Sequence, residues 1–190
     1  MKNIFLAIAI ITFSLSCKAQ SIISLEQAAI YNKSDEGLPE TVTYVKDINN
    51  RLDQFVGTWK GSYGGKNFVI KFIKLINYGE YSVKWDEIIG NLLITDNNGN
   101  VLHNSFNTDF KQAGNLKGYN FQNRSYVLGF VANSYCNDSG DVFIEVRKNN
   151  PNEMTLYFMR DTGIYDPKKC PSYSSYVPLL PEDKMTLIKQ

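Results

Sequence analysis

The stretch "FVGTWKG" at residues 55–61 separates two kinds of sequence and decides the fold class. Before it, Asp47–Gln54 is amphipathic, with Ile48, Leu52 and Phe55 at positions i, i+4 and i+7. This spacing predicts a short helix with one apolar face. After it, the helical period is lost and β-forming residues dominate. The stretch is therefore expected to open a β-barrel, which either holds a ligand or is filled by its own side chains.

Several later segments alternate apolar and polar residues with a period of two. They are "NFVIKFIKL" (67–75), "YSVKWDE" (81–87), "DVFIEVR" (141–147) and "EMTLYFMR" (153–160). In the second, Tyr81, Val83 and Trp85 share one face, and Glu87 continues that face. Such alternation is typical of antiparallel strands with one buried side.

Turn residues separate these segments. Gly64-Gly65 and Asn98-Gly99 are typical of tight hairpin turns, because their residues tolerate positive φ. "RKNNPNEM" (147–154) predicts a longer hairpin loop, with Pro151 where no ladder hydrogen bond is needed. About eight to ten strands at this spacing suit a sandwich or a barrel. We expect an all-β fold, an antiparallel up-and-down barrel preceded by a short N-terminal helix.

The chain divides into three parts. Residues 1–20 form a leader, and residues 21–46, which contain Gly37 and Pro39, are expected to be an extended arm or linker. Residues 47–190 are expected to form the barrel domain, with a loop over 171–181 before a last strand at 184–189.

Composition excludes some functions. The 190 residues carry 20 basic and 19 acidic side chains, with no basic stripe, so nucleic-acid binding is not indicated. Aromatic residues make up 13% of the chain, as expected for a globular, β-rich protein.

The first 20 residues indicate export. Lys2 precedes an apolar core from Ile4 to Phe13, which is too short for a membrane-spanning helix of about 20 residues. Two processing routes remain open. "SLSC" is similar to a bacterial lipobox, in which Cys17 becomes lipid-modified and anchors the protein to a membrane, although Ser14 stands where that motif prefers Leu. Cleavage after "KAQ" would instead leave Ser21 first, in a soluble secreted or periplasmic form.

Export leaves Cys136 and Cys170 as an even pair in an oxidising compartment. Both lie in polar, loop-like sequence, where a disulfide is easily placed, with free thiols as the alternative. No metal site and no cofactor are expected, because the only histidine, His103, lies far from both cysteines in the sequence.

The order of a short helix, "FVGTWKG" and a meander of hairpins resembles the start of lipocalins and fatty-acid-binding proteins, the calycin group. Gly57 and Trp59 match the Gly-x-Trp motif of those families, and Asp47–Gln54 matches their capping helix. The resemblance implies that Trp59 is structural and packs across the closed end of the barrel. The partner arginine of those barrels is not evident, and Lys189 is the nearest basic residue. The layout also resembles an uncharacterised family of small exported bacterial proteins, for which no activity is implied.

No motif supports catalysis. Two classes of function remain. The first is a barrel that binds a small apolar or amphipathic ligand. The second is an interaction or inhibitor module, a filled barrel whose Tyr-rich loop ("GIYDPKKCPSYSSYVPLLP", 163–181) binds another envelope protein, a glycan or a foreign enzyme. A lumen above about 300 Å³ favours the first class, and a lumen packed with aromatic side chains favours the second. The candidate ligand-facing residues are Tyr81, Val83, Trp85, Tyr126 and Phe130.

Overall fold

The computed structural model describes residues 21–79, 82–109, 111–163 and 165–190. The leader with Cys17 and the candidate ligand residue Tyr81 lie outside these ranges.

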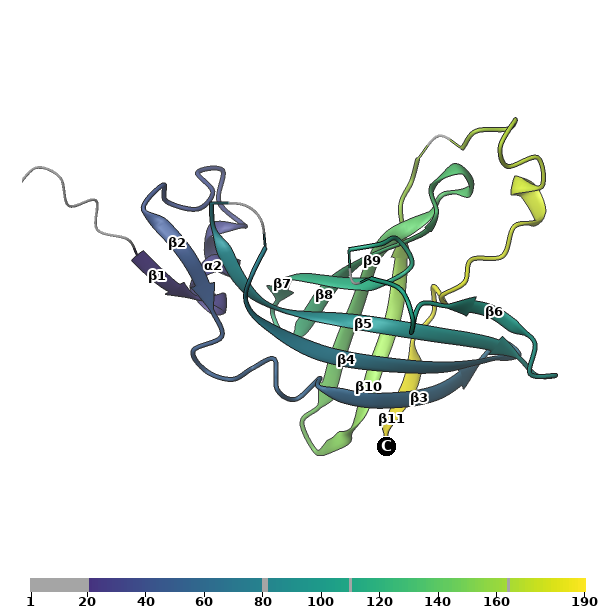
Figure 1. The fold of residues 1–190 in the computed structure, drawn as a ribbon, viewed down its shortest axis with the longest axis horizontal. Helices are drawn as coiled ribbons and strands as arrows, with labels where there is room; N and C mark the ends of the chain where they lie inside the picture. Colours follow the sequence, from purple (N-terminus) through teal and green to yellow (C-terminus); the bar gives the residue numbers. More distant parts are fainter. Residues whose placement is uncertain (1–20, 80–81, 110, 164) are drawn as a thin grey trace, which may run out of the picture.

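Eight antiparallel strands form a closed barrel (Figure 1). Each strand pairs with the next along the chain, which is the predicted up-and-down order. Pairing of the first and last strands, with Trp59 opposite Lys189, and of the third and fourth, with Gly90 opposite Leu116, completes the ring. The strands are β3 (Gly57–Tyr63), β4 (Lys66–Tyr78), β5 (Lys84–Asp96), β7 (Leu116–Gln122), β8 (Ser125–Asn133), β9 (Asp138–Arg147), β10 (Asn150–Arg160) and β11 (Met185–Lys189).

The glycine pairs form turns as predicted. Gly64 and Gly65, at φ +57° and +78°, connect β3 to β4 in two residues. Asn98-Gly99 leads from β5 into β6 (Val101–Asn104), a short strand that pairs with β5 outside the barrel ring. The third hairpin is tighter than predicted, because Arg147 already pairs with Asn150. Pro151 lies in β10 where the register shifts, so no ladder bond is lost there.

The barrel is filled by its own side chains. Phe121 and Tyr126 lie with ring centroids 4.8 Å apart, and Phe130 meets Phe158 edge-on at 6.1 Å. The interior-facing strand residues, each at most 9% exposed, are Trp59, Phe68, Ile70, Phe72, Ile88, Leu92, Ile94, Leu116, Phe121, Tyr126, Leu128, Phe130, Val142, Ile144, Val146, Met154, Leu156, Phe158, Met185 and Leu187.

Residues 21–46, which we expected to be an extended arm or linker, instead fold into β1 (Ser21–Ser24), α2 (Leu25–Tyr31) and β2 (Val42–Lys46). The α2 helix begins with a capping box, in which Ser24 and Gln27 exchange hydrogen bonds. β2 pairs in parallel with β5, and β1 pairs in parallel with β2. Figure 1 shows β4 and β5 continuing past the barrel towards this N-terminal unit.

The prediction of a helix over Asp47–Gln54 is wrong, because this segment forms successive turns. The Asp47 carboxylate accepts the backbone N–H groups of Arg51 (2.8 Å) and Leu52 (3.0 Å), and Asn50 has a positive φ of +53°. Side-chain bonding of this kind competes with helix formation. Leu52 is fully buried, whereas Ile48 is 54% exposed, so the predicted apolar face is not formed.

A disulfide links two loops at the end of the barrel away from residues 47–54. The predicted bridge between Cys136 and Cys170 is present, with the two Cα atoms 5.4 Å apart. It joins the short turn η1 (Ser134–Cys136), which follows β8, to the long loop before β11 that contains η2 (Tyr173–Ser175). Further along this loop, Leu180 is buried and Pro181 accepts a hydrogen bond from the Phe158 N–H at 2.9 Å. The end of this loop therefore packs against the barrel.

Candidate functional site

Trp59 lies in the barrel core. Its side chain is 0% exposed, and its indole N–H donates to the Phe55 carbonyl at 2.7 Å. The Lys189 ammonium lies 5.2 Å from the ring centroid, where the resemblance to calycins would place an arginine. Gly57 has φ +127°, and an added Cβ would come within 3.0 Å of the Lys189 side chain. Gly57 is thus favoured mainly by its positive φ, because the end of the flexible Lys189 side chain could move away from a Cβ.

The five candidate ligand-facing residues do not form one site. Tyr126 and Phe130 point into the barrel and are each 1% exposed, so they belong to the core. Val83 and Trp85 are partly exposed and line a pocket on the outside of the barrel. Tyr81 lies outside the described residues.

We name this hollow the β5–β7 outer pocket. It has a volume of about 700 Å³, in the range of small-molecule sites. It lies where the outer face of β5 meets β7, beside the end of α2. Its lining residues are Asn32, Tyr78, Gly79, Val83, Trp85, Glu87, Ile89, Lys111, Lys117 and Tyr119.

The alternation of β5 explains why these side chains meet. Trp85, Glu87 and Ile89 point outwards into the pocket, while Ile88 points into the core. On the side away from the pocket, the buried Asp86 carboxylate accepts the N–H groups of Asp47 and Asn77, each at 2.9 Å. These bonds fix the start of β5, and with it Trp85, to the neighbouring segments.

Tyr44 also holds the start of β5. Its hydroxyl donates to the Asp86 carboxylate. Burial, together with this hydrogen bond, raises the pKa of Tyr44 to about 12, so the phenol keeps its proton at neutral pH. The strand segment that carries Trp85 is therefore held in place by one hydroxyl and two backbone N–H groups, all of which donate to the Asp86 carboxylate.

Glu87 is the electrostatically unusual residue of the pocket. Burial raises the pKa of its carboxyl from 4.5 to about 7, and the positive charge of Lys117 opposes this rise. Among the residues that the structure describes, no hydrogen bond or ion pair to the Glu87 carboxylate is found. Lys117 itself donates to the Lys111 carbonyl at 2.6 Å. The pocket thus contains a carboxyl group with a raised pKa that receives no hydrogen bond from the described residues.

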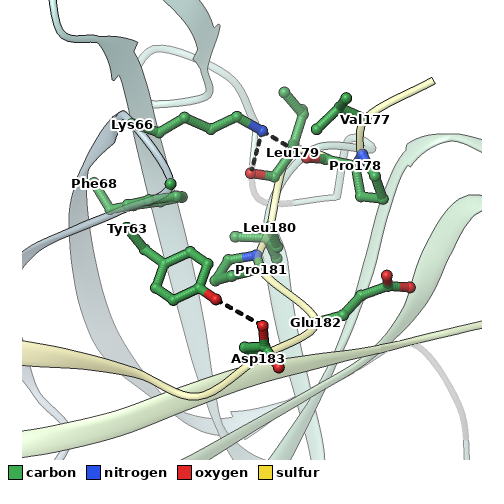
Figure 2. Close-up of a pocket in the computed structure, with 11 residues that line it drawn as sticks. Tyr63, Lys66, Phe68, Val177, Pro178, Leu179, Leu180, Pro181, Glu182 and Asp183 are labelled. Atoms are coloured by element: carbon green, nitrogen blue, oxygen red, sulfur yellow. Dashed lines mark hydrogen bonds between the residues drawn. The ribbon is translucent and has the colours of Figure 1, made fainter. Parts of the chain in front are cut away.

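A second, smaller pocket of about 350 Å³ lies between the β3–β4 hairpin and residues 177–183 (Figure 2). Its polar groups bind one another. Lys66 donates to the carbonyls of Pro178 (2.6 Å) and Leu179 (3.3 Å), and the Tyr63 hydroxyl donates to Asp183 (2.7 Å). Burial lowers the pKa of Lys66, which the charge of Asp138 opposes. These contacts attach the end of this loop to the barrel and leave few polar groups for a ligand.

Two other polar residues, His103 and Asp96, have local structural contacts. The His103 ring nitrogen Nε2 lies 2.9 Å from the Gly114 carbonyl. Asp96 accepts hydrogen bonds within its own turn, including two from Asn100. Among the described residues there is no cluster of three or more His, Cys, Asp or Glu side chains that could bind a metal ion. In the same ranges, no helix is long and apolar enough to span a membrane.

Sequence reasoning missed most of the pocket. Glu87 continues the face of Trp85, and the same period of two extends to Ile89. The alternation in the sequence therefore predicts that Glu87 and Ile89 lie on the same face as Trp85. Lys117 and Tyr119 come from β7, whose pairing with β5 leaves no local signal. Asn32 follows a helix that the capping box Ser24–Gln27 could have revealed.

A protein-family model of unknown function, DUF6705, matches residues 1–190. The chain belongs to this family. Searches of curated proteins and of solved structures give no match to the DUF6705 chain.

Proposed function

We propose that this DUF6705 protein binds a small apolar or amphipathic molecule in the β5–β7 outer pocket, without catalysis. One observation carries the proposal: the pocket of about 700 Å³ combines the partly exposed Trp85 with the Glu87 carboxylate, which accepts no hydrogen bond from the described residues. Ligand sites are mostly apolar hollows with a few polar groups that orient the ligand. The lumen, where calycins would hold a ligand, is occupied by the protein's own aromatic side chains.

Tryptophan fluorescence tests this function. The chain has two tryptophans, and only Trp85 lies in the pocket. A phenyl-alkyl compound such as 4-phenylbutan-1-ol should change the emission of the wild type but not that of Trp85→Phe. Trp85→Ala should weaken its binding at least about fivefold by calorimetry, as expected for losing an aromatic wall. Met159→Ala, an exposed apolar side chain on β10, serves as the matched control. Unchanged affinity in Trp85→Ala would refute the proposal.

The second candidate is an interaction module that uses the Tyr-rich loop, favoured by the filled lumen. Tyr165 and Tyr173 stack with ring centroids 3.9 Å apart, and the Lys169 ammonium lies 4.1 Å from the Tyr135 ring centroid. The disulfide holds this loop, so its aromatic surface is ordered before any partner arrives. Tyr135→Ala should leave binding of 4-phenylbutan-1-ol unchanged if the two surfaces act separately. A loss equal to that in Trp85→Ala would contradict the assignment of the small molecule to the outer pocket.

We also propose that the protein is exported to the cell envelope, with Cys17 as a lipid anchor. The disulfide supports an oxidising compartment, because such bonds are rare in the cytosol. Labelling with a palmitate analogue should mark the wild type and not Cys17→Ser. A mature protein that begins at Ser21 and stays in the aqueous phase would contradict the anchor.

A further inference from the structure

The β5–β7 outer pocket has a polarity that restricts its ligand. Its apolar wall comes from Val83, Trp85 and Ile89. The polar group nearest to this wall in the strand is Glu87, which lies between Trp85 and Ile89 on the same face. This carboxylate is partly withdrawn from water and accepts no hydrogen bond from the described residues, so its ionised form is unfavourable unless a ligand binds it.

We infer that the ligand of this pocket carries a protonated amine, which binds the Glu87 carboxylate beside the Trp85 indole while an apolar body covers Val83 and Ile89. This inference rests on the proposed function and specifies the chemical class of its ligand. An ammonium group would supply the missing donor to Glu87 and would form a charge-assisted hydrogen bond. The faces of Trp85, Tyr78 and Tyr119, which also line the pocket, attract cations.

Lys117, whose charge acts on Glu87, does not reverse this preference. Lys117 already donates to the Lys111 carbonyl, so part of its hydrogen-bonding capacity is used. Its positive charge acts on Glu87, but burial outweighs that effect, since the pKa of Glu87 remains raised. An anionic ligand that reached Lys117 would place its negative charge near the unpaired Glu87 carboxylate, which is unfavourable.

Three ligands of the same apolar body separate the possibilities: 4-phenylbutylamine, 4-phenylbutyrate and 4-phenylbutan-1-ol. Calorimetry with the full mature chain at about pH 8 should show the amine binding at least about tenfold more tightly than the butyrate, with the alcohol between them. Glu87→Gln should abolish this preference while the alcohol still binds. Glu153→Gln, which removes a surface carboxylate paired with Arg147 at 2.8 Å, is the control and should change none of the three affinities.

The pH dependence provides a second readout. Glu87 shares the pocket with the ionisable groups of Tyr78, Lys111, Lys117 and Tyr119, and its own pKa is raised to about 7 by burial. The affinity for the amine should therefore rise between about pH 6 and about pH 8 as Glu87 loses its proton, whereas that for the alcohol should stay constant.

The outcomes distinguish this inference from the proposed function. If the three ligands bind equally, or the butyrate binds most tightly, the amine is wrong but the binding function stands. If Glu87→Gln keeps the amine preference, the assignment to Glu87 is wrong. If none of the three binds, the proposed function fails, and this inference fails with it.

Discussion

Replacing Trp59 with alanine should remove a large part of the stability of the barrel. The side chain is 0% exposed, so truncation leaves a cavity in the core, which costs about 3–5 kcal/mol. The Phe55 carbonyl would also lose the donor that now lies 2.7 Å away, which adds about 1 kcal/mol. The total of about 4–6 kcal/mol is comparable to the whole stability of many small domains.

Urea unfolding followed by circular dichroism, with the disulfide intact, measures this loss. Trp59→Phe keeps most of the ring but not the indole N–H, and should cost about 1–2 kcal/mol. Trp85→Ala is the matched control, because Trp85 is partly exposed in the outer pocket and should cost less than about 2 kcal/mol. A Trp59→Ala protein that unfolds at the wild-type urea concentration would refute the assignment of Trp59 to the core and the resemblance on which it rests.

Three further predictions concern the fold. The free energy of unfolding of Glu87→Gln should equal that of the wild type at about pH 4 and exceed it by about 1–2 kcal/mol at about pH 8. The raised pKa of Glu87 makes its ionisation destabilising as the pH rises from 4.5 through about 7, and partial exposure of the side chain reduces the effect. Urea unfolding at both pH values tests this, and an equal difference at both would contradict it. Gly118→Ala should cost about 1–3 kcal/mol, because the new Cβ would lie 2.7 Å from the Ile88 carbonyl, whereas Gly129→Ala, with its nearest atom at 3.9 Å, should melt like the wild type. The Cys136→Ala/Cys170→Ala protein should lose about 3–4 kcal/mol, as expected for opening a link across 34 residues, and a melting temperature equal to that of the wild type would show that the bridge does not stabilise the fold.

Much of the barrel could be predicted because its signals are local. Alternation along 67–75 and 141–147 marks strands, and Gly64-Gly65 fixes one hairpin and its register. Ring closure could not be predicted in the same way. It depends on β11 meeting β3 and on β7 meeting β5, and such pairings between distant segments leave no periodic signal.

The errors near the first barrel strand have a common physical cause. The spacing of Ile48, Leu52 and Phe55 fits a helix, but the Asp47 carboxylate binds the following backbone N–H groups and holds the segment in turns. The helix that does form, at Leu25–Tyr31, depends on its capping box and on packing against the barrel. Side-chain hydrogen bonds of this kind override a short apolar period.

The candidate site was only half predictable. Period two correctly places Trp85 and Glu87 on one face, but it does not say whether that face points into the barrel or away from it. Apolar residues occupy both faces of β5, with Ile88 inside and Ile89 outside. Hydrophobicity therefore does not show which face of the strand points into the barrel. Tyr126 and Phe130 were therefore grouped with Trp85 although they lie on the opposite side of the barrel wall.

The most direct test of a ligand site outside a filled barrel is a crystal structure of the protein with 4-phenylbutylamine. We predict that the phenyl ring lies against Trp85 and Ile89, with the amine at the Glu87 carboxylate and the barrel interior unchanged. Ligand density among the interior side chains such as Phe72 and Leu92, density at the Tyr-rich loop, or an empty outer pocket at saturating amine would contradict the account.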